Sequence, residues 1–296
     1  MQNTTRATLI GCVALLLWST LAILTALANP IPPFQMVAMA FFVAALLAPI
    51  KWIARRESVT AHLKQPIGAW VLSVAGLFGY HFFYFVALRL APPVEANLLN
   101  YLWPLLIVLF SALLPGARLG VPHVLGAACG LAGAVLLVIG PGAAFDPRYV
   151  TGYAAALACG VIWSAYSVAN RRYKNVPSDA VGGFCAATAI LAAICHFALE
   201  PTVTPTDWQW LVMLALGLGP VGGAFYVWDY GCKHGDIRAL GTLAYGVPLV
   251  SNALLIATGR GVLDWRVAIA AVLIIGGAVI GTGLKRRAAE PTLAQP

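Results

Sequence analysis

The sequence predicts an all-α polytopic membrane protein of ten transmembrane helices, built as two inverted five-helix repeats with both termini in the cytoplasm. Three observations support this prediction. Apolar residues fall into runs of about twenty, Lys and Arg gather between alternate runs, and several residue pairs recur at a constant spacing. Runs of that length can cross a hydrocarbon core of roughly 30 Å at about 1.5 Å per residue.

The composition separates this chain from soluble proteins. Of its 296 residues, 61% are hydrophobic and only 9% are charged, against about 25% charged in soluble domains. The net charge of +8 comes from short basic clusters between apolar runs. Because no basic stripe follows a single segment, we expect no nucleic acid partner. The six cysteines lack metal-ligand spacing, so they are interpreted as packing residues, and no metal or cofactor is expected.

Gly, Pro and charged residues separate the ten runs, taken in chain order. They cover 7–28, 34–52, 67–89, 94–114, 121–140, 150–170, 180–199, 208–232, 238–258 and 266–284. The first run follows a short N-terminus and lacks a clear small-residue cleavage site, so it is interpreted as a span and not a signal peptide. The connections are short, which leaves no room for a folded domain outside the membrane.

The basic residues predict the orientation. Fourteen of the eighteen Lys and Arg residues lie at the N-terminus, in the connections after runs 2, 4, 6 and 8, or in the C-terminal tail. The other four are Arg89, Arg148, Arg260 and Arg266. Cytoplasmic connections carry the excess of basic residues, so both termini are expected in the cytoplasm. We expect a multi-pass protein of the bacterial inner membrane, with the lipid bilayer as its surroundings.

An internal repeat predicts how the runs are arranged. Three sets of residues recur at an offset of 144 or 145: Trp18-Ser19 as Trp163-Ser164, Tyr101 and Pro104 as Tyr245 and Pro248, and Gly133-Ala134-Val135 as Gly277-Ala278-Val279. The predicted boundaries are 1–146 for the first repeat, 147–285 for the second, and 286–296 for a cytoplasmic tail. Five spans are an odd number, so the second repeat enters the membrane from the opposite side, as in secondary transporters.

Paired prolines predict a site near the middle of the membrane. Pro104 and Pro248 lie in mid-run, where each deprives the carbonyl four residues earlier, Asn100 or Ala244, of its donor and kinks the helix. In run 4 the kink coincides with a polar helix face that includes Asn97. Such paired interruptions favour a substrate cavity. The alternative is a kink used only for packing.

Aromatic and titratable residues deep in the runs extend this candidate site. Large rings there can stack on a planar or apolar substrate. Trp52, Trp208, Trp210 and Trp265 lie at run ends and are instead interpreted as interface anchors. His81 is either a hydrogen-bonded packing residue or a group that switches charge. The predicted substrate-binding residues are Trp18, Tyr80, His81, Tyr84, Asn100, Tyr101, Trp103, Trp163 and Tyr245.

Two further patterns concern coupling and assembly. The sequence places no Asp or Glu clearly at mid-membrane, because Glu95 and Asp229 lie near run ends. Proton-driven transporters commonly place a carboxylate in the path, so facilitated movement down the substrate gradient is favoured. Pairs of glycines spaced four residues apart in runs 5 and 10 allow close helix approach. They either pack the two halves together or dimerise the chain, which leaves a monomer or a weak dimer open.

The ten spans, the inverted halves, the early Trp in each half and the Pro-kinked fourth run resemble the drug/metabolite transporter superfamily, in its EamA-type branch. Within it, the stretch from Ala91 to Pro104, APPVEANLLNYLWP, together with Tyr80-His81, is similar to the aromatic amino acid exporters of the YddG type. The resemblance implies export of aromatic and other neutral amino acids through a central cavity lined by both halves. It implies that all the predicted binding residues except Asn100 lie at or near that cavity.

Two other functions would require features of their own. Efflux of other small metabolites or drugs, possibly proton-coupled, predicts an intramembrane Glu, which the sequence does not show. A membrane-bound lipid enzyme needs paired carboxylates or a Ser/His arrangement. The five histidines lie in separate segments and the acidic residues are scattered, so we expect a transporter and not an enzyme.

Overall fold

A computed structural model describes residues 2–117, 119–139, 145–259 and 264–282. In these ranges ten helices are long and apolar enough to cross a membrane, which confirms the predicted number of spans. They cover Asn3–Ala28, Pro33–Ala54, Ile67–Leu90, Pro93–Leu113, Val121–Val138, Pro147–Tyr173, Ser178–Leu199, Asp207–His234, Ile237–Ala257 and Trp265–Thr282. Arg118, Arg260 and the predicted tail at 286–296 lie outside the described residues.

Several spans consist of more than one helix. The first repeat contains α1 (Gln2–Ser19), α2 (Leu21–Ala28), α3 (Pro33–Ala54), α4 (Val59–Leu63), α5 (Ile67–Val74), the π-turn η1 (Ala75–Gly79), α6 (Tyr80–Leu90), α7 (Pro93–Asn100), α8 (Trp103–Phe110), η2 (Ser111–Leu113) and α9 (Val121–Val138). The second contains η3 (Pro147–Tyr149), α10 (Val150–Ala169), η4 (Asn170–Tyr173), η5 (Ser178–Ala180), α11 (Val181–Leu199), α12 (Asp207–Leu218), α13 (Gly223–His234), α14 (Ile237–Leu243), α15 (Gly246–Ala257) and α16 (Trp265–Thr282).

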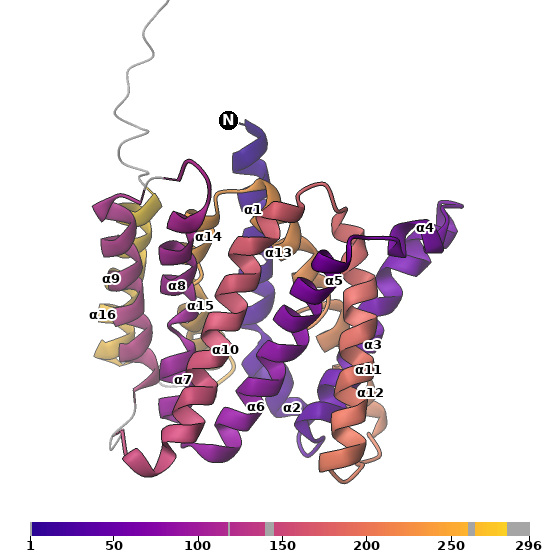
Figure 1. The fold of residues 1–296 in the computed structure, drawn as a ribbon. Coiled ribbons are helices and arrows are strands. Elements are labelled where there is room, and N and C mark those ends of the chain that lie inside the picture. Colours follow the sequence, from indigo (N-terminus) through magenta and orange to yellow (C-terminus); the bar gives the residue numbers. More distant parts are fainter. Residues whose placement is uncertain (1, 118, 140–144, 260–263, 283–296) are drawn as a thin grey trace, which may run out of the picture.

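The connections alternate between two faces of the helix layer. One face, called here the N-terminal face, carries the N-terminus and α4 (Figure 1). The other, the distal face, carries the turn after α2 and the connection from α6 to α7 (Figure 1). The basic connections after spans 2, 6 and 8 therefore share the N-terminal face. The connections therefore alternate between the two faces, as ten consecutive spans require.

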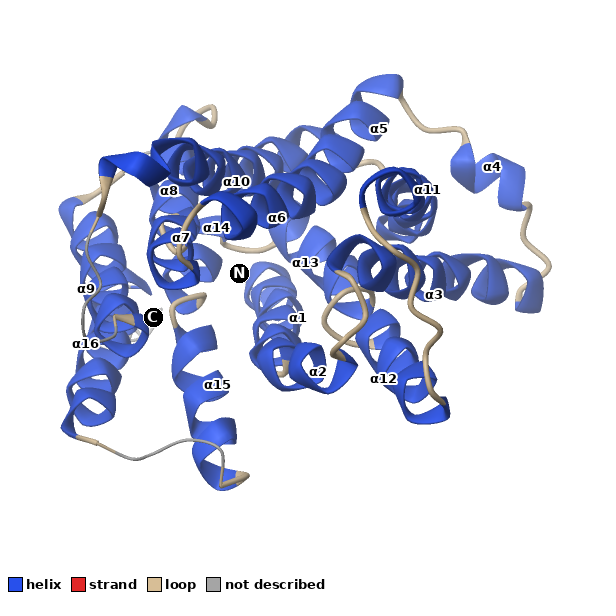
Figure 2. Cartoon of the chain, turned by 90° about the horizontal axis from the view of Figure 1, so that it is seen from below, coloured by secondary structure: helices blue, strands red, loops and turns tan. Residues whose placement is uncertain are grey.

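Helices from opposite repeats pack in pairs related by the repeat. Span 2 packs on span 7 through α3 and α11, and span 5 packs on span 10 through α9 and α16. Span 1 packs on span 8 through α1 and α13, and its symmetry equivalent is span 6 on span 3 through α10 and α6. Figure 2 shows α9 and α16 at one end of the molecule and α3 and α11 toward the other. The two repeats thus interlock instead of forming separate lobes.

The glycine pairs of spans 5 and 10 face each other within the chain. A Cβ added at Gly126 would lie 2.5 Å from the carbonyl oxygen of Gly277 and 2.5 Å from Gly281 Cα. No side chain fits at that distance, so the two backbones touch directly. Of the two roles left open by the sequence, the structure uses these glycines to pack the halves together.

Several spans are interrupted at equivalent positions in the two repeats. Span 4 breaks between α7 and α8 at Tyr101–Leu102, and span 9 breaks between α14 and α15 at Ala244–Tyr245. The prediction of a donor-less carbonyl at Ala244 is wrong, because the Val247 amide donates to that oxygen at 3.0 Å. The tightened turn before Pro248 satisfies the backbone with a bond to the third residue instead of the fourth.

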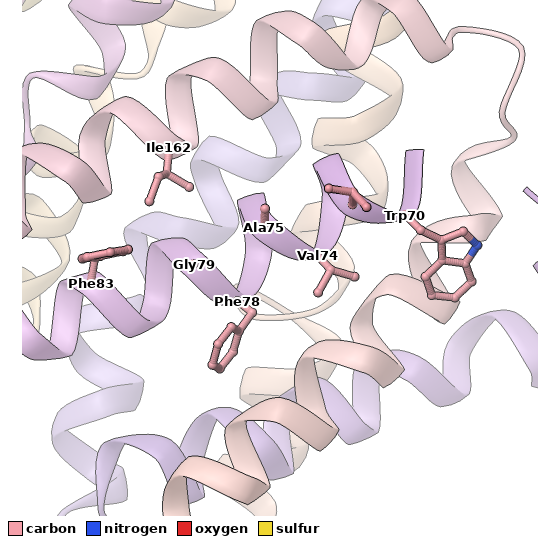
Figure 3. A pocket seen from close by; sticks show the side chains of 8 residues that line it. Trp70, Val74, Ala75, Phe78, Gly79, Phe83 and Ile162 are labelled. Carbon is pink, nitrogen blue, oxygen red and sulfur yellow. The ribbon is translucent and has the colours of Figure 1, made fainter. Parts of the chain in front are cut away.

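Spans 3 and 8 are also interrupted at matching places. Span 3 contains the π-turn η1, and span 8 breaks over Gly219–Gly222. On the outer surface, η1 leaves an apolar groove of about 520 Å³ that includes Val74, Phe78 and Phe83 (Figure 3). The described residues that line the groove include no Asn, Tyr, His or charged side chain. This surface therefore suits contact with lipid chains and is not the candidate site.

One predicted membrane anchor is wrong. Trp52 is fully buried, stacks on His62 with ring centroids 4.5 Å apart, and donates to Asp179 Oδ2 at 3.4 Å. Because Trp52 lies at a run end, it was expected beside lipid headgroups, but the α4 segment covers its ring. Trp208, Trp210 and Trp265 are exposed at the starts of their helices, as anchors require.

Candidate functional site

A cavity of about 980 Å³ enters the helix layer from the distal face. Its mouth includes the turn Asn29–Pro33 and Leu88 near the end of α6. Its deepest lining residues, among them Trp163 and Phe225, lie in mid-span. The cavity therefore reaches about halfway through the molecule and is closed toward the N-terminal face.

Eight of the nine predicted binding residues line this cavity. They are Trp18, Tyr80, His81, Tyr84, Asn100, Tyr101, Trp103 and Trp163. They come from α1, α6, the α7–α8 break and α10, so both repeats contribute. The kink residues Pro104 and Pro248 are buried in α8 and α15 and do not line the cavity.

Tyr245 lies outside the cavity. Its ring is fully buried against Gly130, where a Cβ would lie 2.4 Å from the ring, and its hydroxyl oxygen accepts from the Leu105 amide at 3.1 Å. The repeat relates Tyr245 to Tyr101, which does line the cavity. The halves share a sequence pattern, but only one of the two tyrosines faces the open side in this conformation. Tyr245 is a packing residue here.

One wall of the cavity is polar and uncharged. The Tyr84 hydroxyl donates to Asn97 Oδ1 at 2.8 Å, and Asn100 Nδ2 donates to the Tyr80 hydroxyl at 3.2 Å. Cys159 lies behind this wall, with its thiol 3.2 Å from Asn100 Oδ1. These contacts fix the orientation of both amides, so the wall is preorganised to exchange hydrogen bonds with a bound molecule.

His81 is oriented by the π-turn. Its Nδ1 lies 2.7 Å from the Leu77 carbonyl oxygen within η1. A carbonyl only accepts, so Nδ1 carries the proton, and in the neutral ring Nε2 is the acceptor. The ring meets Phe41 edge-on with centroids 5.2 Å apart. π-turns often occur at functional sites, and this one positions an imidazole at the cavity wall.

Tryptophans form the floor of the cavity. Trp18 meets Trp163 edge-on at 5.6 Å and Trp103 edge-on at 6.2 Å between ring centroids. Trp228 lies 5.0 Å from Trp18 and is fully buried. The Trp18 indole donates to the Pro220 carbonyl oxygen at 2.9 Å, in the break of span 8. The floor therefore joins spans 1, 4, 6 and 8 and blocks the way to the N-terminal face.

The charged residues nearest to this floor lie beyond it. Within the part of the chain that the structure describes, no Asp, Glu, Lys or Arg is among the residues that line the cavity. Asp229 and Lys233 form an ion pair at 2.8 Å, with side chains 0% and 1% exposed. The sequence interpretation missed this pair, although its i, i+4 spacing on one helix is a usable signal. It also missed Pro220 and Val221, which line the cavity from the break between α12 and α13 in span 8.

The family follows from a comparison of the whole sequence. The model of the EamA-like transporter family matches the chain twice, over residues 5–139 and 150–282. The chain belongs to this family. The double match agrees with two five-helix repeats, and this EamA-like chain is a multi-pass inner-membrane protein of bacteria.

Relatives cover most of the length of this EamA-like chain. An aromatic amino acid exporter YddG of Ancylobacter novellus is 53% identical over 283 residues, which is 95% of this chain and 98% of that protein. An aromatic amino acid exporter YddG of Salmonella typhimurium is 24% identical, covering 84% of this chain and 87% of that protein. A solved crystal structure with 52% identity superposes with a TM-score of 0.91, covering 97% of this chain and 99% of that one.

Proposed function

We propose that this protein exports aromatic and other neutral amino acids from the cytoplasm by alternating access. The observation that supports it best is the cavity itself, which is neutral, lined by rings and amides, and open to one face only. A volume of about 980 Å³ lies at the upper end of the roughly 300–1,000 Å³ typical of small-molecule sites. That size suits a large amino acid with some water, which agrees with the aromatic amino acid export named for the relative at 53% identity.

The wall chemistry suits a zwitterion. An amino acid at neutral pH carries one positive and one negative group, so its net charge is zero. Asn97 and Asn100 offer both amide donors and carbonyl acceptors, and Nε2 of neutral His81 offers a further acceptor. The Trp18 and Trp163 rings at the floor then contact the substrate side chain. Charged wall residues are not needed for such a substrate.

The basic residues assign a direction to the cavity. The N-terminal face carries the Lys- and Arg-rich connections and is therefore cytoplasmic in this proposal. The distal face is then periplasmic, and the conformation described here is outward-open. Export requires a second conformation in which the tryptophan floor opens toward the cytoplasm. Because the described residues that line the cavity include no carboxylate, we propose facilitated movement down the substrate gradient.

Counterflow into proteoliposomes tests this function. Vesicles loaded with unlabelled phenylalanine should accumulate labelled phenylalanine or tryptophan. Labelled glutamate, lysine and a cationic drug, used in the same assay, test the alternative that the protein exports other metabolites or drugs. Removal of a pH gradient should not change the rate. Accumulation of the drug in place of the aromatic amino acids, or dependence on the pH gradient, would favour proton-coupled efflux of other metabolites.

Matched tryptophan variants test the site. Trp163→Ala removes a ring from the cavity floor, whereas Trp208→Ala removes the same ring from an exposed lipid-facing position. We expect counterflow to fall about tenfold or more in the first variant and to stay at the wild-type rate in the second. Size-exclusion profiles of both variants should match the wild type if they are folded. Equal rates would remove Trp163 from the transport path.

A further inference from the structure

The apolar groove beside η1 runs along the outer surface of span 3. Figure 3 shows Trp70 at one end of the groove and Phe83 at the other, with Ile162 on the neighbouring helix α10. The stretch from Trp70 to Phe83 rises by about 20 Å at about 1.5 Å per residue. One leaflet supplies about half of a hydrocarbon core of roughly 30 Å. The groove is therefore long enough for one acyl chain from one leaflet.

The π-turn and two small residues explain why this surface is hollow. On the inner side of η1, a Cβ at Gly76 would lie 2.5 Å from Tyr166 Cγ, so the turn packs directly against α10. On the outer side, Ala75 is exposed and lines the groove. A Cβ at Gly79 would make only ordinary contact with Ile162, at 3.6 Å from its Cγ2. Because Ala75 and Gly79 bring little or no side chain, the volume of about 520 Å³ stays open to the membrane.

On the side of span 3, the groove ends beside a basic connection. Trp70 lies in α5, close to where this helix begins at the N-terminal face. Its indole donates to the Leu63 carbonyl oxygen at 3.3 Å. Lys64 follows Leu63 directly and is exposed. One cation is thus fixed next to the end of the groove by a contact of a groove residue.

On the side of span 6, the groove ends beside a second basic connection. The wall that includes Ile162 continues through α10 into η4, at the N-terminal face. A Cβ at Gly68 would collide with the Tyr173 hydroxyl, so η4 touches the first turn of α5. Arg172 and Lys174 flank Tyr173, and both are exposed. Both walls of the groove therefore end at cations.

These cations are available to an anion. Within the part of the chain that the structure describes, the side chains of Lys64, Arg172 and Lys174 form no ion pair. The acidic residues closest to them in the sequence are Glu57 and Asp179, and each already pairs with another side chain. The site consequently combines an apolar groove with a positive end.

We propose that an anionic phospholipid of the leaflet at the N-terminal face binds here, with its phosphate beside Lys64 and Arg172 and one acyl chain in the groove. Basic pockets between membrane helices recognise anionic headgroups in this way. Trp70 lies where the headgroup meets the chain, which is the depth that amphipathic indole rings favour. The cations provide the preference for an anionic lipid, and the groove provides the place for its chain.

A second copy of this chain is a less suitable occupant. Two copies in one membrane have the same orientation, so a symmetric contact across this groove would bring their basic connections together. Like charges that face each other oppose association. A lipid phosphate has the opposite charge, and a flexible acyl chain follows the irregular surface of the π-turn.

The bound chain would lie on the outer side of the turn that orients His81. The Leu77 carbonyl oxygen within η1 lies 2.7 Å from His81 Nδ1. A ligand that binds the folded state stabilises that state. We therefore expect phosphatidylglycerol to raise the thermal midpoint of the purified protein more than phosphatidylcholine does.

Native mass spectrometry of the full-length protein tests the proposal. The detergent-solubilised protein is titrated with dioleoyl phosphatidylglycerol and, in parallel, with dioleoyl phosphatidylcholine. We expect one phosphatidylglycerol molecule to be retained more tightly than the neutral lipid. Lys64→Gln with Arg172→Gln should weaken phosphatidylglycerol binding about 30-fold, because each Lys or Arg near an anionic surface contributes about fivefold. Ala75→Phe, which fills the groove with a ring, should weaken it at least tenfold.

Matched variants supply the controls. Arg6→Gln with Arg55→Gln removes the same charge from exposed positions in α1 and after α3, at the same face. Ala215→Phe adds the same ring at an exposed position of α12. Both controls should bind phosphatidylglycerol as tightly as the wild type.

The readouts separate the possible occupants. Equal binding of the two lipids, or an equal loss in the control variants, would overturn the proposal. A dimer that retains no lipid and dissociates in Ala75→Phe would assign the groove to a second copy instead. Lys64 and Arg172 are exposed, so their substitution decides the question even if Ala75→Phe does not fold. None of these measurements requires transport, so a failure of the proposed function would leave their result unchanged.

Discussion

The contact between spans 5 and 10 allows a matched pair of glycine substitutions. A Cβ at Gly277 would lie 2.5 Å from the Gly126 carbonyl oxygen and 3.0 Å from the Gly130 amide nitrogen. A Cβ at the adjacent Gly276 would meet nothing within 4 Å. Gly277→Ala therefore pushes two backbones apart, whereas Gly276→Ala places the same methyl group in open space. Both positions lie in α16, which makes the comparison internal to one helix.

The expected magnitude follows from this geometry. Both substitutions gain about 1 kcal/mol of helix propensity, and this gain cancels in the comparison. Overpacking at Gly277 costs about 1–3 kcal/mol, because the neighbouring atoms are backbone and cannot rotate away. The equilibrium constant for unfolding should thus be about 5–150 times larger for Gly277→Ala than for Gly276→Ala, because roughly 1.4 kcal/mol corresponds to a tenfold change.

Thermal unfolding of the purified variants, followed by circular dichroism and by the monodisperse fraction after heating, measures the difference. A lower midpoint for Gly277→Ala than for Gly276→Ala is the expected result. Equal midpoints would refute the packing argument. A loss of dimer at an unchanged midpoint in Gly277→Ala would show instead that the glycine face is used between chains.

Two further predictions concern the cavity wall and the buried ion pair. Tyr84→Phe removes the hydroxyl that donates to Asn97 Oδ1. A hydrogen bond of about 0.5–1.5 kcal/mol corresponds to a roughly 2- to 12-fold slower initial rate of phenylalanine counterflow at low substrate. An unchanged rate would exclude a role for this bond. Lys233→Met leaves Asp229 buried without its ion-pair partner, and breaking such a pair lowers the free energy of unfolding by about 3–5 kcal/mol. Lys233→Met combined with Asp229→Asn should recover most of that stability. Thermal midpoints of the purified variants check the second prediction, and equal destabilisation of the single and double variants would contradict it.

Hydropathy predicted the ten spans because each run is long enough to cross the bilayer. The predicted run 67–89 and the observed span Ile67–Leu90 nearly coincide. Hydropathy carried no information on hydrogen-bond register, so the π-turn at Ala75–Gly79 and the break at Gly219–Gly222 were not predicted. These interruptions shape the site, since one holds His81 and the other exposes the Pro220 carbonyl oxygen to Trp18.

The site residues show where repeat symmetry helps and where it misleads. Trp18 and Trp163 are symmetry equivalents that meet at the floor, near the centre of the molecule, so both line the cavity. Tyr101 and Tyr245 are also equivalents, but only Tyr101 faces the cavity. A transporter that is open to one face is asymmetric, and the sequence alone does not show which face is open. Trp52 failed as an anchor because a later segment of the chain covers it.

The structure of the protein with tryptophan or phenylalanine bound tests the central claim most directly. The amino acid should lie in the cavity, with its charged groups within hydrogen-bond distance of the Asn97 and Asn100 amides and its ring against Trp18 or Trp163. Ligand density outside this cavity, or an empty cavity at concentrations that saturate counterflow, would contradict the account.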